Sequence, residues 1–177
     1  MLEKLAILRD KTTHKLLWGL TEKYPKKTRI ISVNNSPYLR RFYITPRRLD
    51  ENGEDSGNFL GFGIYLHYFY RGDEDRELHN HPWESAMSYI LCGGYKEERR
   101  DNKTMSVNLR DIDAGTFNFI KHTDFHRVIM NPKNKHTWSL FFSGKRIQDW
   151  GFWDSETREY IPHENFVEKT DQGYNQK

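Results

Sequence analysis

The chain has almost no cysteine and no long apolar run. A single cysteine, Cys92, among 177 residues excludes an intrachain disulfide. No apolar stretch approaches the roughly 20 residues that a transmembrane helix needs, and no signal-like apolar segment opens the sequence. We therefore expect a soluble, cytoplasmic protein with no membrane partner.

The chain also has little excess of one sign of charge over the other. The 28 basic and 25 acidic residues leave a net charge of +3, which does not favour nucleic acid as a partner. Apolar residues make up 36% of the chain, but aromatic residues make up 15%. Aromatic side chains suit pleated, half-buried surfaces, and the length suits one sizeable core. These features predict a single domain, 1–177, built mainly from sheet.

Periodicity divides the chain into three parts. A spacing close to 3.6 residues predicts an N-terminal helical extension over 1–24, carried by Leu2, Leu5, Leu8, Leu16, Leu17 and Leu20. Short β-type runs separated by turn signals predict a barrel core over 59–155, with strands at 62–70, 85–92, 106–109, 116–120, 127–130, 137–143 and 148–153. The polar segment 47–58 reads as a mobile loop, and 164–177 reads as a loose tail.

One pattern points to chemistry. His79 and His81 are two residues apart, so on an extended backbone they lie on one face and can hold the same ion. His126 lies far enough downstream for the chain to return beside them through a hairpin or two. Three neutral imidazoles would leave a divalent metal its full charge and an open coordination position. The alternative is that His79 and His81 bond turn backbone groups and His126 is a hydrogen-bonded core histidine.

These residues resemble the cupin superfamily. Its first motif, a glycine followed by His-x-His and a later glycine, is matched by Gly72, His79, His81 and Gly93, and its second motif by Gly115 and His126. The segment His79-Asn80-His81-Pro82-Trp83-Glu84 is similar to the corresponding segment of a group of uncharacterised bacterial and phage cupins. The resemblance implies an all-β double-stranded β-helix, or jelly roll, with an N-terminal helix, and a metal inside its mouth.

The glutamate ligand of the cupin motif does not stand at its usual spacing here. Glu84 is three residues from His81, and on a regular strand an odd offset points to the opposite face. A three-histidine set resembles the cupin thiol dioxygenases, which hold ferrous iron, although only Ser139 matches their outer serine-histidine-tyrosine arrangement. This resemblance favours Fe(II), while imidazole ligands also suit Zn, Ni or Mn.

Further residues are candidates around that site. Glu84, His67 and His122 are candidates for additional ligands or for groups that support the ligands; surface or core packing is the alternative for each. The candidate substrate-binding residues, which offer cationic clamps or aromatic walls, are Arg41, Tyr65, Arg71, Trp83 and Arg146.

The functional prediction is a metal-dependent cupin that acts on a small anionic or thiol-containing molecule, with Fe(II) dioxygenase chemistry as the leading reaction. One alternative is a non-catalytic cupin that binds or sequesters a small anionic ligand such as a sugar or nucleotide. Another is an interaction protein in which the metal only stabilises the barrel. A small-molecule ligand is the expected partner, together with a homodimer.

Overall fold

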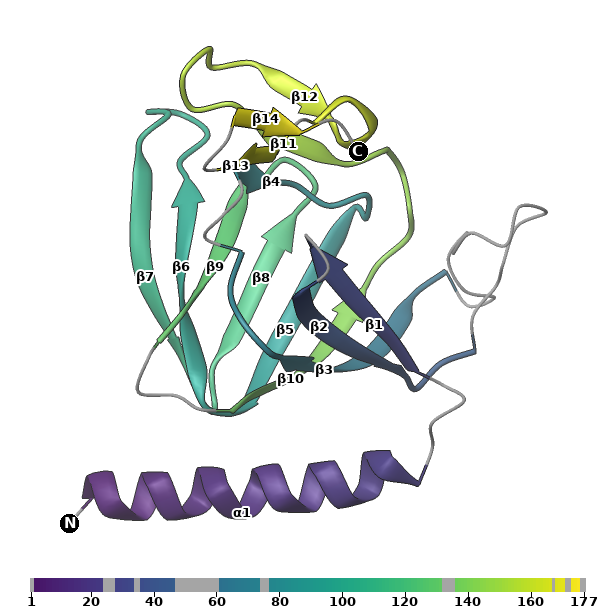
Figure 1. Ribbon diagram of the computed structural model, residues 1–177, viewed down its shortest axis with the longest axis vertical. Helices are drawn as coiled ribbons and strands as arrows, with labels where there is room; N and C mark the ends of the chain where they lie inside the picture. Colours follow the sequence, from purple (N-terminus) through teal and green to yellow (C-terminus); the bar gives the residue numbers. More distant parts are fainter. Residues whose placement is uncertain are drawn as a thin grey trace.

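The chain folds into two facing antiparallel sheets with one helix packed beneath them (Figure 1). The computed structural model describes residues 2–23, 28–33, 36–46, 61–73, 77–131, 136–166, 168–170 and 173–175. The predicted loop 47–58 lies outside these residues. None of the described helices is long and apolar enough to cross a membrane.

The first sheet has the strand order β1-β2-β3-β10-β5-β8. Its strands are β1 (Thr28–Val33), β2 (Ser36–Tyr43), β3 (Gly63–Phe69), β10 (Thr137–Ser143), β5 (Ser85–Cys92) and β8 (Phe117–Lys121). Buried and partly exposed residues alternate along β5, as expected for a strand with one face inside. The inner faces of these strands form one wall of the barrel.

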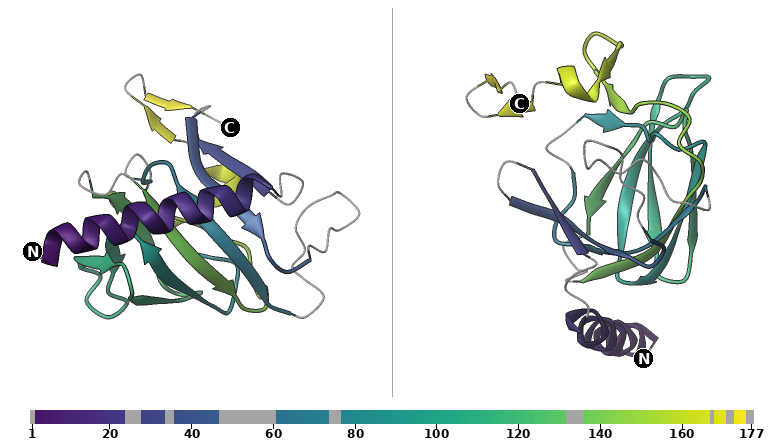
Figure 2. Two further views of the ribbon diagram at one scale, coloured as in Figure 1. Left: turned by 90° about the horizontal axis from the view of Figure 1, so that it is seen from below. Right: turned by 90° about the vertical axis from the view of Figure 1, so that its right-hand side faces the viewer.

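The second sheet has the strand order β12-β11-β4-β9-β6-β7. Its strands are β12 (Tyr160–Pro162), β11 (Gly151–Trp153), β4 (Leu78–His79), β9 (His126–Met130), β6 (Gly94–Arg100) and β7 (Val107–Asp113). Figure 2 shows this sheet facing the first across the barrel interior. Apolar side chains fill the interior in two clusters: one around Ile90 and Tyr95 joins both sheets, and one around Tyr65 and Phe141 lies on the first sheet.

The helix α1 (Leu2–Glu22) packs on the outer face of the first sheet (Figure 2, left). Leu17 and Trp18 contact a buried cluster that includes Cys92 and Trp138. Two hydrogen bonds fix the helix: the Gly93 amide donates to Asp10 at 3.2 Å, and the Trp138 indole donates to His14 Nδ1 at 3.0 Å. The helix forms as predicted, but it covers the sheet through Leu17 and Trp18, whereas Leu5, Leu8, Leu16 and Leu20 are exposed.

Two segments differ from the sequence prediction. The charged run Lys96-Glu97-Glu98-Arg99-Arg100 was not predicted as a strand, yet it lies in β6, where Tyr95 and Glu97 turn inward and are buried. The predicted loose tail contains the 3-10 turn η2 (His163–Asn165) and the hairpin of β13 (Glu168–Thr170) and β14 (Gly173–Asn175). Phe166 in this tail is buried and stacks on Phe152, with ring centroids 3.7 Å apart.

Candidate metal centre

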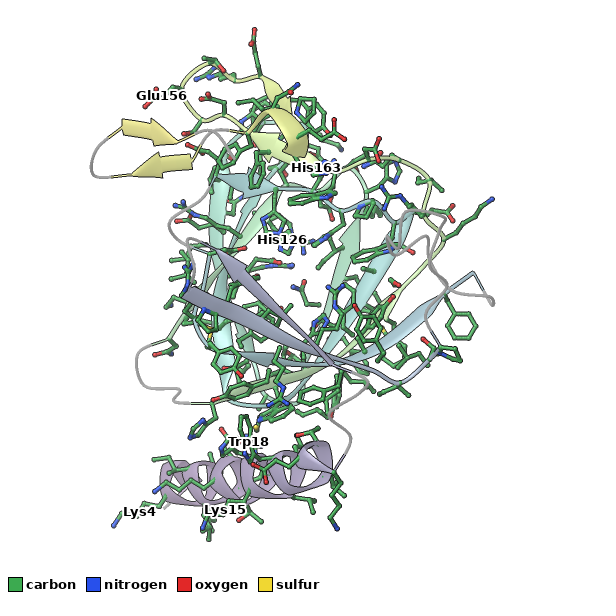
Figure 3. The ribbon with its side chains drawn as sticks, turned by 45° about the vertical axis from the view of Figure 1, so that its right-hand side comes forward. Lys4, Lys15, Trp18, His126, Glu156 and His163 are labelled. Atoms are coloured by element: carbon green, nitrogen blue, oxygen red, sulfur yellow. The ribbon has the colours of Figure 1, made fainter. Side chains whose placement is uncertain are left out.

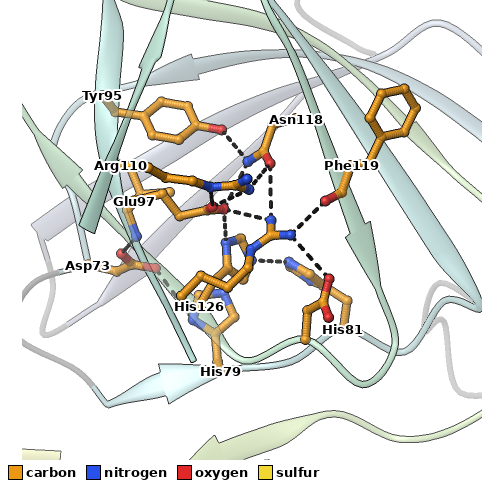
Figure 4. A network of polar contacts seen from close by, with 12 residues as sticks. Asp73, His79, His81, Tyr95, Glu97, Arg110, Asn118, Phe119 and His126 are labelled. Atoms are coloured by element: carbon orange, nitrogen blue, oxygen red, sulfur yellow. Dashed lines mark hydrogen bonds and ion pairs between the residues drawn. The ribbon is translucent and has the colours of Figure 1, made fainter. Parts of the chain in front are cut away.

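Three histidines meet inside the barrel. His79 ends β4, His126 begins β9, and the two residues are direct register partners in the second sheet. His81 follows two residues after His79, and its Nε2 lies 2.8 Å from Nε2 of His126. One ligand nitrogen from each of the three lies within 4.8 Å of the others. The structure therefore brings together the three residues that the sequence predicted as a set (Figure 4).

A buried carboxylate sets the tautomer of His126. Nδ1 of His126 lies 2.7 Å from Oε1 of Glu97, a residue of β6 that is 0% exposed. A carboxylate accepts hydrogen bonds, so Nδ1 carries the proton and Nε2 presents its lone pair. That lone pair faces His81, where an ion held by both rings would sit.

Asp73 lies behind His79 in a similar position, at a longer distance. Its Oδ2 lies 3.5 Å from Nδ1 of His79, and its side chain is fully buried. The backbone of Val128 in β9 anchors Asp73, since the Val128 amide donates to Oδ1 and the Val128 carbonyl accepts from the Asp73 amide. Carboxylates behind ligating histidines are common in metal sites, where they fix ring orientation and raise ligand basicity.

Glu97 is held by several donors besides His126. Arg99 and Asn118 donate to Oε1 at 3.0 and 2.8 Å, and Arg110 donates to Oε2 at 2.6 Å (Figure 4). Burial alone would raise the pKa of Glu97, but the hydrogen bond from His126, the charge of Arg99 and the hydrogen bond from Asn118 outweigh it and lower the pKa. Glu97 is therefore ionised and can act only as an acceptor toward His126.

The donor set fits a transition-metal ion. Burial holds the pKa of His81 well below its usual range, and the neighbouring His126 and Arg41 lower it further, so this ring is neutral. Neutral imidazole nitrogens with fixed tautomers are ligands for Fe, Zn, Ni and Cu. The residues present therefore fit the kind of ion that the sequence predicted, without selecting one metal.

The histidines open onto a cavity of about 440 Å³. On the β2 and β3 side it is lined by Arg41, Tyr65 and His67. Nε of Arg41 donates to Nε2 of His67 at 3.0 Å, and the guanidinium carbon lies 4.9 Å from the Tyr65 ring centroid. Burial, with the charge of Arg41, lowers the pKa of His67 well below its usual range, so the acceptor of this bond is a neutral ring.

Aromatic side chains line another part of the cavity. Trp83 stacks on His81 with centroids 5.3 Å apart and an interplanar angle of 23°, and Trp150 stacks on His163 at 4.8 Å and 18°. Arg146 also lines the cavity and donates to Asp149 at 2.7 Å, so its charge is compensated. This part of the cavity offers flat apolar surface more than free charge.

The other predicted residues lie elsewhere. Glu84 is exposed, and its backbone carbonyl lies 3.2 Å from Nδ1 of His122. Neither residue lines the cavity. Arg71 also lies outside the cavity lining, and its guanidinium donates to the Gly72 carbonyl at 3.3 Å.

Sequence reasoning missed several residues of the site, among them Glu97, Asp73 and His163. Tyr95, Glu97 and Arg99 alternate along β6 and share a face, which was the available signal for Glu97. Asp73 stood in a segment that reads as an ordinary turn, Arg71-Gly72-Asp73. His163 lies beyond the predicted barrel core, and only the return of β12 and η2 brings it to the cavity.

The sequence matches no protein-family model and no curated protein. Among solved structures, a cupin-2 domain from Rhodospirillum rubrum superposes with a TM-score of 0.53 and 11% identity, over 76% of this chain and 80% of that chain. An oxalate oxidase in complex with glycolate gives a TM-score of 0.48 and 14% identity, over 76% and 66% of the two chains. Fe(II)-HppE with an alternative substrate superposes with a TM-score of 0.48 and 10% identity, over 67% of this chain and 57% of that chain.

The likeness to the cupin-2 domain shows the fold. The chain has a jelly-roll fold of two antiparallel sheets with one N-terminal helix, similar to the fold of the cupin-2 domain and as the sequence predicted. This chain spans little more than half of the HppE chain.

Proposed function

We propose that this cupin binds one divalent transition-metal ion through His79, His81 and His126 and acts on a small anionic molecule in the adjoining cavity. The observation that carries the proposal is the convergence of three ligand nitrogens within 4.8 Å, two of them on rings with a buried carboxylate behind Nδ1. The bound ion would supply Lewis acidity and, as Fe(II), a centre for oxygen chemistry. Three protein ligands leave room for substrate at the same ion.

Arg41 provides the second recognition element. Among the described residues, its guanidinium has no carboxylate partner; it bonds a neutral histidine and lies over a tyrosine ring. An arginine held by Nε keeps its two terminal nitrogens available for a carboxylate or phosphate. An anionic group on the substrate would compensate this charge, and His67 would keep the guanidinium in place.

A binding module remains the second candidate, and the aromatic lining favours it. Trp83, Trp150 and His163 supply stacking surface for a planar or sugar ring. Catalysis requires a proton-transfer group near the ion, and His67, Tyr65 and Tyr95 are buried side chains of that kind that line the cavity. We therefore rank the enzyme first.

Metal content tests the site. Wild-type protein purified without a chelating column, refilled with Fe(II) or Zn(II) and desalted, should hold about one equivalent by elemental analysis. His81→Ala should lose it, whereas the matched control His122→Ala, a histidine outside the cavity, should keep it. Equal metal content in both variants, or far less than one equivalent in the wild type, would contradict the proposal.

Oxygen uptake separates the two functions. The iron-loaded protein would be screened with thiols, small carboxylates and sugar nucleotides, using an oxygen electrode and thermal shift in parallel. A ligand at about 100 times its dissociation constant adds about 2.7 kcal/mol of stability. Binders that are recovered unchanged without oxygen consumption would favour the binding module. Arg41→Gln should weaken anionic ligands and leave the metal content at one equivalent.

A further inference from the structure

The helix α1 carries apolar side chains on two opposite sides. One side faces the barrel through His14, Leu17 and Trp18. The other side carries an outer leucine stripe, defined as Leu5, Leu8, Leu16 and Leu20, which are 56%, 61%, 63% and 50% exposed. At about 100° per residue these four leucines fall within one third of the helix circumference. In Figure 3 Trp18 points toward the barrel, whereas Lys4 and Lys15 point away from it.

The spacing of the outer leucine stripe is nearly symmetric. Leu8 and Leu16 each lie four residues from Thr12, and Leu5 and Leu20 are equidistant from a point between Thr12 and Thr13. An antiparallel copy of α1, related by a two-fold axis near Thr12, would therefore place leucine against leucine on both sides of the axis. Isologous contacts of this kind require a self-complementary surface.

We propose that α1 pairs antiparallel with α1 of a second copy of this chain through the outer leucine stripe. The barrels would lie on opposite sides of the helix pair, because the exposed stripe lies on the side of α1 opposite Leu17 and Trp18, which contact the barrel. Lys4 of one copy would lie beside Glu22 of the other, since the two residues share a flank five turns apart. A helix that is apolar on two faces is expected to be covered on both.

The size of the contact sets its strength. A helix of 21 residues is about 31 Å long and about 10 Å wide, so pairing covers a strip of about 300 Å² on each copy. A standard interface buries about 800 Å² per partner. Lys11 and Lys15 of opposite copies would also lie near each other close to the axis and oppose pairing. We therefore expect a weak, reversible dimer that forms only at high protein concentration.

Sedimentation velocity tests the pairing in the full chain. From about 5 to about 500 µM the wild type should shift from monomer to dimer. Leu8→Gln/Leu16→Gln should stay monomeric, whereas the control Leu109→Gln, which changes a leucine of β7 that is also 56% exposed, should dimerise like the wild type. Circular dichroism checks that the helix is retained. A wild type that is monomeric throughout, or a dimer that survives the double substitution, overturns the proposal.

Disulfide trapping tests the antiparallel register. Cys92 is fully buried, so a new surface cysteine can be oxidised selectively. Thr12→Cys lies at the axis and should form a covalent dimer, whereas Leu5→Cys alone should not, because its counterpart lies at the other end. Equal trapping of both variants would refute the register. Binding to vesicles containing phosphatidylserine, lost in Leu8→Gln/Leu16→Gln, would assign the stripe to a membrane surface and refute the dimer.

Discussion

Replacing Glu97 with glutamine tests whether the buried carboxylate supports the histidine cluster. Glutamine keeps the shape and one acceptor oxygen, which can still receive the hydrogen bonds from His126 and Asn118 at the Oε1 position. Its amide nitrogen would then face Arg110, and the negative charge would be gone. His126 would lose the ionised partner that fixes its tautomer and raises its basicity.

The side chains that contact Glu97 determine how much stability and metal affinity this substitution should cost. Removing one member of a buried ion pair lowers the free energy of unfolding by about 3 to 5 kcal/mol. Because Arg99 also pairs with Asp124 and Arg110 is 43% exposed, we expect a smaller loss of about 2 to 3 kcal/mol for Glu97→Gln. In a chain of this length that lowers the melting temperature of the metal-free protein by about 4 to 12 °C. Loss of a carboxylate behind a ligating histidine lowers metal affinity about 10- to 100-fold.

Glu98→Gln is the matched control. Glu98 is the next residue of β6, points the other way and pairs with Arg127 at 2.6 Å, with both side chains partly exposed. Such a pair contributes about 0 to 1 kcal/mol. Thermal unfolding of the metal-free proteins and competition with a metal-binding dye would compare the two variants. If Glu97→Gln lost no more stability and no more metal affinity than Glu98→Gln, the supporting role of Glu97 would be refuted.

Three further predictions concern the fold. Gly93→Ala should lower the free energy of unfolding by at least about 2 kcal/mol in denaturant, because its φ is +74° and a Cβ would lie 2.2 Å from a backbone oxygen. Gly115→Ala, with φ +87° but open space around the Cβ position, should lower it by about 1 kcal/mol. Equal losses in the two variants would contradict this reasoning. Burial raises the pKa of the Cys92 thiol to about 11, so at pH 8 it should react with a thiol reagent at least about 100-fold more slowly in the native protein than in denaturant. Phe166→Ala should cost about 3 kcal/mol by thermal unfolding because it removes the stack on Phe152, and an unchanged melting temperature would show that the tail does not support the barrel.

The sequence alone was sufficient to predict the fold class and to predict that the three histidines come together. Alternation and turn signals are local, so β5 and β10 were predicted with the bounds that the structure has. The two-residue spacing of His79 and His81 fixes their common face by the geometry of an extended chain. The odd offset of Glu84 likewise predicted that its side chain would not join them, and the structure places it on the surface.

Only the tertiary structure decided what surrounds those histidines. Glu97 looks like one charge in a solvated run, and its burial depends on β6 lying between β9 and β7, a pairing that no local pattern encodes. The bond between Arg41 and His67 joins β2 and β3 across 26 positions of the chain, a contact that no local pattern predicts. Side-chain periodicity determines which face a residue takes, but strand order determines which residues meet there, and strand order arises from the packing of the whole chain.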